Sequence, residues 1–129
     1  MSAVDRLLAQ ARLGLRRVDA RQAKQIHDEG GLLIDIRPAA QRAEFGGIPG
    51  ALIVERNDLE WRLDPGGSHR LPEAEDPGRP VVVVCQEGYA SSLAAASLHE
   101  VGRTAATDLE GGFVAWKNAG LPTTPGSRP

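Results

Sequence analysis

The residue best placed to do chemistry is Cys85, the only cysteine in the chain. It follows four valines at 81–84 and precedes the run Gln86-Glu87-Gly88-Tyr89-Ala90-Ser91-Ser92, which leads into alanine-rich sequence. This order predicts a buried strand, a tight loop and a helix start, with the thiol at the first loop position. Loop N–H groups and the helix macrodipole can both point at the sulfur and favour thiolate over thiol. We therefore interpret Cys85 as a nucleophile, the alternative being a small buried hydrophobic residue.

Two further pairs of charged residues follow predicted strands, Asp35 with Arg37 and Glu55 with Arg56. Because ligands of parallel α/β sheets collect beyond the carboxyl ends of the strands, we expect these pairs to converge on the thiol. For Asp35 and Arg37 we favour a local ion pair at the strand exit over direct chemistry. The three histidines share no spacing, so a metal site or a Cys–His dyad has little support.

The elements that must position these side chains alternate between strands and helices, as a parallel α/β sheet requires. Apolar runs predict strands at 32–34, 51–54, 81–84 and 105–109 and a short edge strand at 15–18. Helical periodicity, capping signals and terminating glycines predict helices at 1–15, 19–29, 39–45, 92–101 and 113–119, and a further helix that Asn57 or Asp58 can cap and that carries Leu59, Trp61 and Leu63.

The chain of 129 residues is expected to divide into an amphipathic N-terminal helix at 1–14, one domain at 15–122 and a flexible tail at 123–129. The charge of the first helix is mixed and its apolar face narrow. Packing onto its own domain is therefore favoured over a partner-binding or membrane-surface role. The segment 64–79 is rich in Pro, Gly and charge, which is typical of a surface loop.

The composition narrows the function classes. A net charge of -2 with both signs interspersed gives no electrostatic case for nucleic acid as the main partner. A single cysteine excludes an intrachain disulfide, so the thiol of a catalytic Cys85 must be regenerated by a nucleophile from another molecule. The sequence shows no signal peptide and no membrane span, and we expect a cytoplasmic, reducing compartment.

Six segments in a fixed order carry a resemblance to a known family. They are 33–37, 44–45, 47–51, 81–91, 109–116 and 120–122, within a region from Leu15 to Pro122. Together they resemble the rhodanese family, which comprises single-domain sulfurtransferases and noncatalytic relatives. The resemblance implies an α/β, three-layer fold with a five-stranded parallel sheet flanked by helices.

The resemblance also implies that Cys85 takes up a sulfane sulfur as a persulfide, from thiosulfate or a persulfide donor, and passes it to a thiol or other nucleophilic acceptor. Donor and acceptor would be small molecules or protein thiols, with no metal or organic cofactor. Backbone N–H groups around the negative terminal sulfur would stabilise it. The residues expected to bind substrate are Gln86, Glu87, Gly88, Tyr89, Ala90, Ser91, Arg37 and Arg56.

Two departures from the family pattern affect the expected substrate. The family often has Arg, Thr or Ser where this chain has Ala90, and often His where it has Gly47. Ala90 lacks a polar donor, and the carboxylate of Glu87 opposes the approach of a dianion. We therefore expect modest use of free thiosulfate and better use of a persulfide, with Arg37, Arg56 or Arg62 as the candidate source of positive charge at the mouth of the site. Either Ser91 or Ser92 can cap the following helix, and for both we favour capping alone.

Two alternatives remain beside sulfur transfer. One is a noncatalytic rhodanese-like binding or regulatory module, which Ala90 and Glu87 favour and retention of Cys85 disfavours. The other is phosphatase or arsenate reductase chemistry on the same fold, which generally needs a longer loop with an arginine after the cysteine. No arginine follows Cys85 before Arg103, so this second alternative is disfavoured.

Overall fold

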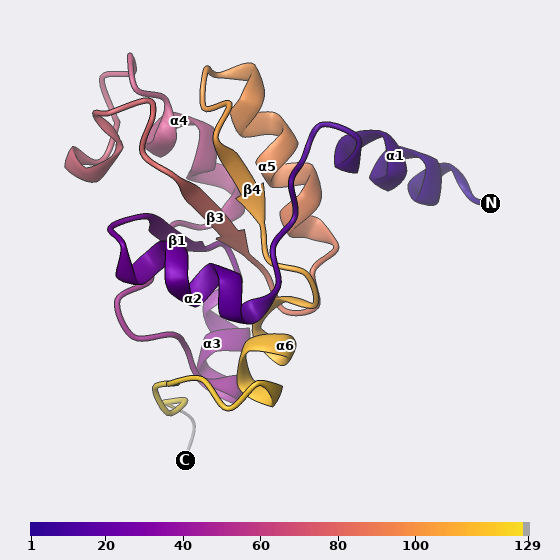
Figure 1. Ribbon diagram of the computed structural model, residues 1–129, viewed down its shortest axis with the longest axis vertical. Coiled ribbons are helices and arrows are strands. Elements are labelled where there is room, and N and C mark those ends of the chain that lie inside the picture. The colour runs from indigo at the N-terminus through magenta and orange to yellow at the C-terminus, as the bar shows by residue number, and fades with distance from the viewer. Residues whose placement is uncertain (128–129) are drawn as a thin grey trace.

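The computed structural model describes residues 1–127. The helices are α1 (Ala3–Arg12), α2 (Ala20–Asp28), α3 (Ala39–Phe45), α4 (Leu59–Leu63), α5 (Ala90–Glu100) and α6 (Gly112–Asn118), with short 3₁₀ turns at Arg56–Asp58 and Pro72–Ala74. The strands are β1 (Leu32–Asp35), β2 (Leu52–Ile53), β3 (Val81–Val84) and β4 (Ala106–Asp108). Figure 1 shows the strands running through the middle of the molecule with helices on both sides.

Within the described residues the sheet has four strands in the order β2-β1-β3-β4, and all neighbouring pairs are parallel. The prediction of a parallel α/β sheet is confirmed, but the prediction of five strands is wrong. The expected edge strand at 15–18 makes only an isolated bridge from Val18 to Leu109. The contact lies at the carboxyl end of β4, where the Val18 N–H donates to the Asp108 carbonyl and the Glu110 N–H donates to the Val18 carbonyl, and no ladder continues from this bridge along β4.

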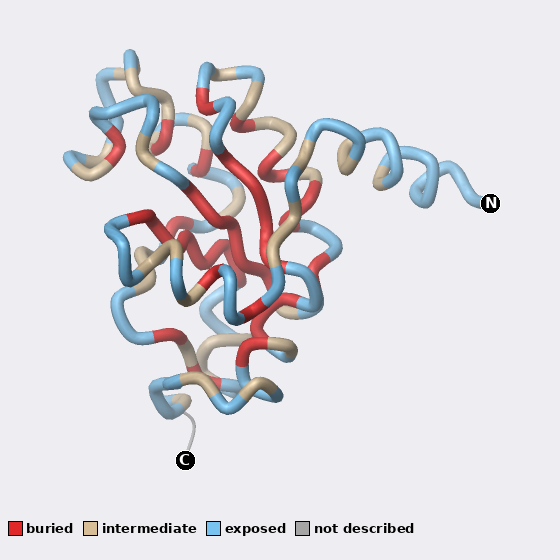
Figure 2. Tube along the Cα trace, viewed as in Figure 1, coloured by how far each residue is buried: buried red, intermediate tan, exposed pale blue. Residues whose placement is uncertain are grey.

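The two faces of the sheet are covered by different helices because successive strand residues point to opposite sides. Ile34 and Val83 lie in one core cluster with residues of α4 and α5, whereas Leu33, Val82 and Val84 lie in a second cluster with residues of α2 and α6. All four residues of β3 are buried (Figure 2). The buried strand β3 therefore fixes the position of Cys85, the residue that follows it.

The helix boundaries follow from local signals. Asp19 accepts from the Gln22 N–H and Gln22 accepts from the Asp19 N–H, so the predicted capping box at the start of α2 is confirmed.

The apolar side chains Val4 and Leu7 of α1 remain 64% and 55% exposed. Figure 1 shows why: α1 reaches outward from the body, and its C-terminal end is the part near α5.

The segment expected to form a tail begins close to the domain. Thr124 exchanges both backbone hydrogen bonds with Gly47, at 3.0 and 2.8 Å. The last two residues of that segment, 128–129, lie outside the described residues. The chain up to Thr124 therefore contacts the α3–β2 connection.

Candidate active site

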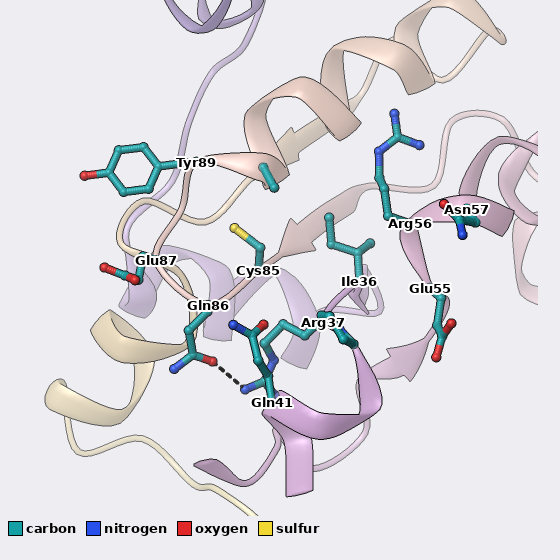
Figure 3. A pocket seen from close by; sticks show the side chains of 12 residues that line it. Ile36, Arg37, Gln41, Glu55, Arg56, Asn57, Cys85, Gln86, Glu87 and Tyr89 are labelled. Atoms are coloured by element: carbon teal, nitrogen blue, oxygen red, sulfur yellow. Dashed lines mark hydrogen bonds between the residues drawn. The ribbon is translucent and has the colours of Figure 1, made fainter. Parts of the chain in front are cut away.

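Cys85 lies directly after β3, where the carboxyl end of the central strand meets the loop to α5. The residue is 7% exposed, and its sulfur faces the pocket drawn in Figure 3. The Gly88 and Ser91 N–H groups both point at Sγ, with N···S distances of 3.2 and 3.3 Å. Two backbone donors on one sulfur stabilise negative charge there without any charged side chain.

The loop holds this curvature because it packs against the turn before α6. Gly88 has φ +89°, and a Cβ there would lie 2.7 Å from the Gly111 nitrogen, so only glycine fits. The Phe113 and Val114 N–H groups donate to the carbonyls of Cys85 and Gln86, at 2.9 and 3.2 Å. Because a trans peptide points its C=O and N–H in opposite directions, these bonds turn the Gln86 and Glu87 N–H groups away from α6.

A buried carboxylate, Asp108 at the end of β4, ties the loop to the sheet. The hydroxyls of Ser91 and Ser92 donate to it at 2.8 and 2.7 Å. The prediction that these serines cap α5 is wrong, since the N-terminus of α5 has no side-chain cap. Asp108 instead accepts their hydroxyl protons, and that contact fixes the first turn of α5.

Arg37 lies at the pocket floor, but its guanidinium is already occupied. It forms a buried ion pair with Asp35 at 2.7 Å and donates to the Gly46 carbonyl at 2.8 Å. A third bond runs to Gln86 Oε1 at 3.0 Å, drawn as the dashed line in Figure 3. The Phe113 ring covers its face at 4.2 Å. Through these contacts Arg37 links the end of β1 to the loop that follows Cys85.

Arg56 lies across the pocket from Cys85 and is also paired. It donates to both Glu60 oxygens at 2.9 Å, and its side chain is 41% exposed. Burial acts to raise the pKa of Glu60, but hydrogen bonds from Ser97, from its own backbone N–H and from Arg56 outweigh it and hold that pKa below its usual value. Arg56 therefore carries a largely neutralised charge.

The pocket over the thiol has a volume of about 490 Å³ and brings most of the expected site residues together. Its walls come from α3 and the segments after β1, β2 and β3; the lining includes Arg37, Arg56, Cys85, Gln86, Glu87, Tyr89 and Ala90. Gly88 and Ser91 do not line it and reach the sulfur from below through their backbone N–H groups. In Figure 3 the side chains of Glu87 and Tyr89 point away from the sulfur.

Three polar residues behind the loop were not predicted from the sequence: Arg12, Arg17 and Asp108. Arg12 and Arg17 each donate to the Gly88 carbonyl at 2.9 Å. No local pattern marks the two arginines, because Gly88 is 76 and 71 residues away from them in the sequence.

Among residues 1–127 no three His, Cys, Asp or Glu side chains gather as a metal-binding group, and none of the helices there has the length and apolarity needed to cross a membrane.

Comparison with known proteins places this geometry in a family. Residues 19–119 match the Rhodanese-like domain. The chain belongs to the rhodanese-like domain family. A sulfurtransferase from Allochromatium vinosum is 37% identical over 91 residues, covering 70% of this chain and 76% of that protein. The thiosulfate sulfurtransferase GlpE from Pseudomonas fluorescens is 28% identical over 102 residues, covering 79% of this chain and 84% of GlpE.

Among solved structures, a protein of unknown function from Rhodopseudomonas palustris, described as a possible tyrosine phosphatase, superposes with a TM-score of 0.84. It is 28% identical, and the match covers 95% of each chain. Two other curated relatives are longer, since this rhodanese-like chain spans only 21% and 46% of their lengths. The shared unit is thus one rhodanese-like domain, which occurs alone and as part of larger proteins.

Proposed function

We propose that this rhodanese-like domain is a sulfurtransferase that carries a sulfane sulfur on Cys85. The observation that carries the proposal is the thiol itself: its Sγ faces a pocket and accepts two backbone N–H bonds in a loop that only glycine at 88 permits. The sulfurtransferase relatives support the same chemistry.

The proposed reaction exchanges one sulfur–sulfur bond for another. The Cys85 thiolate attacks the outer sulfur of thiosulfate, the bond to the sulfite sulfur breaks, and sulfite leaves with the electron pair. A persulfide donor reacts in the same way and leaves as a thiolate. An acceptor thiolate then attacks the terminal sulfur of the Cys85 persulfide, and the electron pair returns to Cys85. Sulfur and electrons balance without an oxidant, a metal or an organic cofactor.

The charges around the pocket favour a persulfide over thiosulfate as donor. Arg37 is paired with Asp35 and Arg56 with Glu60, whereas Glu55 and Glu87 take part in no ion pair found within residues 1–127. A dianion entering this pocket finds no unpaired arginine among the lining residues, and the carboxylates of Glu55 and Glu87 at the pocket edge oppose its approach although the Glu87 side chain points away from the sulfur. A persulfide on a small molecule or on a protein carries less charge at the reacting end, so it is the better donor.

Donor choice is tested at position 90, which is exposed at the pocket rim. Ala90→Arg should raise the second-order rate constant for thiosulfate about five- to ten-fold, because it adds a cation where the dianion enters. The gain should shrink in high salt, since exposed charges are screened over about 8 to 10 Å near physiological ionic strength. The uncharged variant Ala90→Gln is the matched control. Equal acceleration of iodoacetamide alkylation by Ala90→Arg would contradict the argument.

A phosphatase function, as the description of the R. palustris neighbour suggests for that protein, has weaker support. The first arginine after Cys85 is Arg103, which is buried and donates to the carbonyls of Leu63, Ala74, Asp76 and Arg79. It precedes β4 and so lies toward the amino end of a sheet whose carboxyl end holds Cys85. It is not among the residues that line the pocket over the thiol.

The deciding experiment is intact-mass measurement after incubation with thiosulfate or with a persulfide of a small thiol. We expect one added sulfur atom per chain, removed by cyanide with release of thiocyanate. No added sulfur from either donor would reject sulfur transfer in favour of a noncatalytic rhodanese-like module.

A further inference from the structure

The carbonyl of Gly88 accepts hydrogen bonds from two arginines at once. Arg12 Nη2 and Arg17 Nη2 both lie 2.9 Å from this oxygen. Gly88 is the residue whose N–H bonds the Cys85 sulfur at 3.2 Å. Both arginines belong to the segment before residue 19, where the match to the Rhodanese-like domain begins. The N-terminal segment therefore contacts the active loop from outside the matched region.

The two arginines are held in place by the network at the base of α5. Arg17 forms an ion pair with Asp108 at 2.9 Å, with a second bond at 3.2 Å. Arg12 Nε donates to the Ser92 hydroxyl at 3.0 Å, and Ser92 donates on to Asp108. The Arg12 guanidinium also lies 5.9 Å from the centre of the Tyr89 ring. Asp108 pairs directly with Arg17 and is linked to Arg12 only through Ser92, so the two guanidinium groups and the one carboxylate leave one positive charge behind the loop.

We propose that Arg12 and Arg17 are positioning residues for sulfur transfer, acting through the Gly88 carbonyl. Glycine has no side chain to fix its own orientation, so external contacts must hold Gly88 at φ +89°. Two charge-assisted hydrogen bonds on its carbonyl do so and keep its N–H aimed at Sγ. Their effect reaches the sulfur through the orientation of the Gly88 N–H, which is one of the two backbone donors to Sγ.

This arrangement supplies the positive charge that the pocket itself lacks. In front of the sulfur, Arg37 and Arg56 are each paired with a carboxylate and position 90 is alanine. Behind the loop, Arg12 and Arg17 stabilise a negative sulfur through the backbone without occupying the pocket. The inference rests on the proposed persulfide chemistry of Cys85, but its electrostatic part concerns the thiol alone and can be measured without any sulfur donor.

The test compares Arg12→Ala, Arg12→Lys and Arg12→Ala/Arg17→Ala with Arg16→Ala in the full chain. Arg16 is an exposed neighbour in the same segment, so its removal controls for the loss of one charge. Arg12→Ala should lower kcat for sulfur transfer about ten-fold with little change in KM, and the double variant should lower it further. The pH of half-maximal iodoacetamide alkylation should rise by about half a unit, and Arg12→Lys should recover part of both effects.

Arg12→Ala is the primary variant because it leaves the Arg17–Asp108 pair intact and so avoids an unpaired buried carboxylate. Thermal melts establish that each variant is folded. If Arg12→Ala matches Arg16→Ala in kcat and in the alkylation profile, the proposal is overturned. A fall in melting temperature with an unchanged alkylation profile also overturns it, since that result indicates support of the fold alone. A wild-type protein that takes up no sulfur would instead reject the proposed function, whatever the alkylation profiles show.

Discussion

Cys85→Ser protein is expected to fold and to lose sulfur uptake and sulfur transfer entirely. A serine hydroxyl can still accept from the Gly88 and Ser91 N–H groups, so the loop keeps its hydrogen bonds and the free energy of unfolding should change by less than about 2 kcal/mol. A hydroxyl cannot hold a sulfane sulfur, so transfer to cyanide or a thiol should fall at least about a thousand-fold. Intact mass and thiocyanate formation measure the two losses.

The chain makes this a clean experiment because it contains no second cysteine. Any sulfur found on the Cys85→Ser protein would have to sit on another kind of group. Transfer at more than a few per cent of the wild-type rate, from protein that melts like wild type, would exclude the persulfide mechanism. Cys85→Ala serves as the matched variant that lacks both the thiol and the hydroxyl.

Arg37→Met should lower the free energy of unfolding by about 3–5 kcal/mol, the largest effect on stability that we expect. The substitution leaves the carboxylate of Asp35 buried without its ion-pair partner, and breaking one side of a buried pair has costs of this order. It also removes the donor to the Gly46 carbonyl. Urea denaturation followed by circular dichroism measures the change.

Two variants make the result specific. Asp35→Asn/Arg37→Met removes both charges, and it should recover a large part of the lost stability because no unpaired carboxylate remains. Arg56→Met removes an arginine from a half-exposed pair with Glu60 and should cost no more than about 1 kcal/mol. If Arg37→Met costs as little as Arg56→Met, the guanidinium is not structural and is available to substrate.

The sequence alone was sufficient to locate the thiol and the elements around it, because those features depend on neighbours in the chain. Four consecutive valines bounded by turn residues are typical of a strand that is buried on both faces, and the glycine at 88 marks the loop that follows. The Asp19/Gln22 capping box and the helix at 39–45 were likewise local signals that the structure confirmed. The prediction of a strand at 15–18 was wrong because a short apolar run does not show how many of its residues will pair with a neighbouring strand.

Only the tertiary structure decided which side chains serve the thiol, because a guanidinium or a hydroxyl has several possible partners and the fold selects among them. Arg37 and Arg56 were both considered as substrate-binding residues; the favoured Asp35–Arg37 ion pair is confirmed, whereas the pairing of Arg56 with Glu60 was not predicted. The serines at the start of α5 were expected to cap that helix, but their hydroxyls donate to Asp108, which lies 17 and 16 residues away in the sequence. Arg12 and Arg17 reach the Gly88 carbonyl across more than 70 residues of sequence. Hydrophobic periodicity reports which face of an element is buried, but contacts between charged side chains depend on how those elements pack.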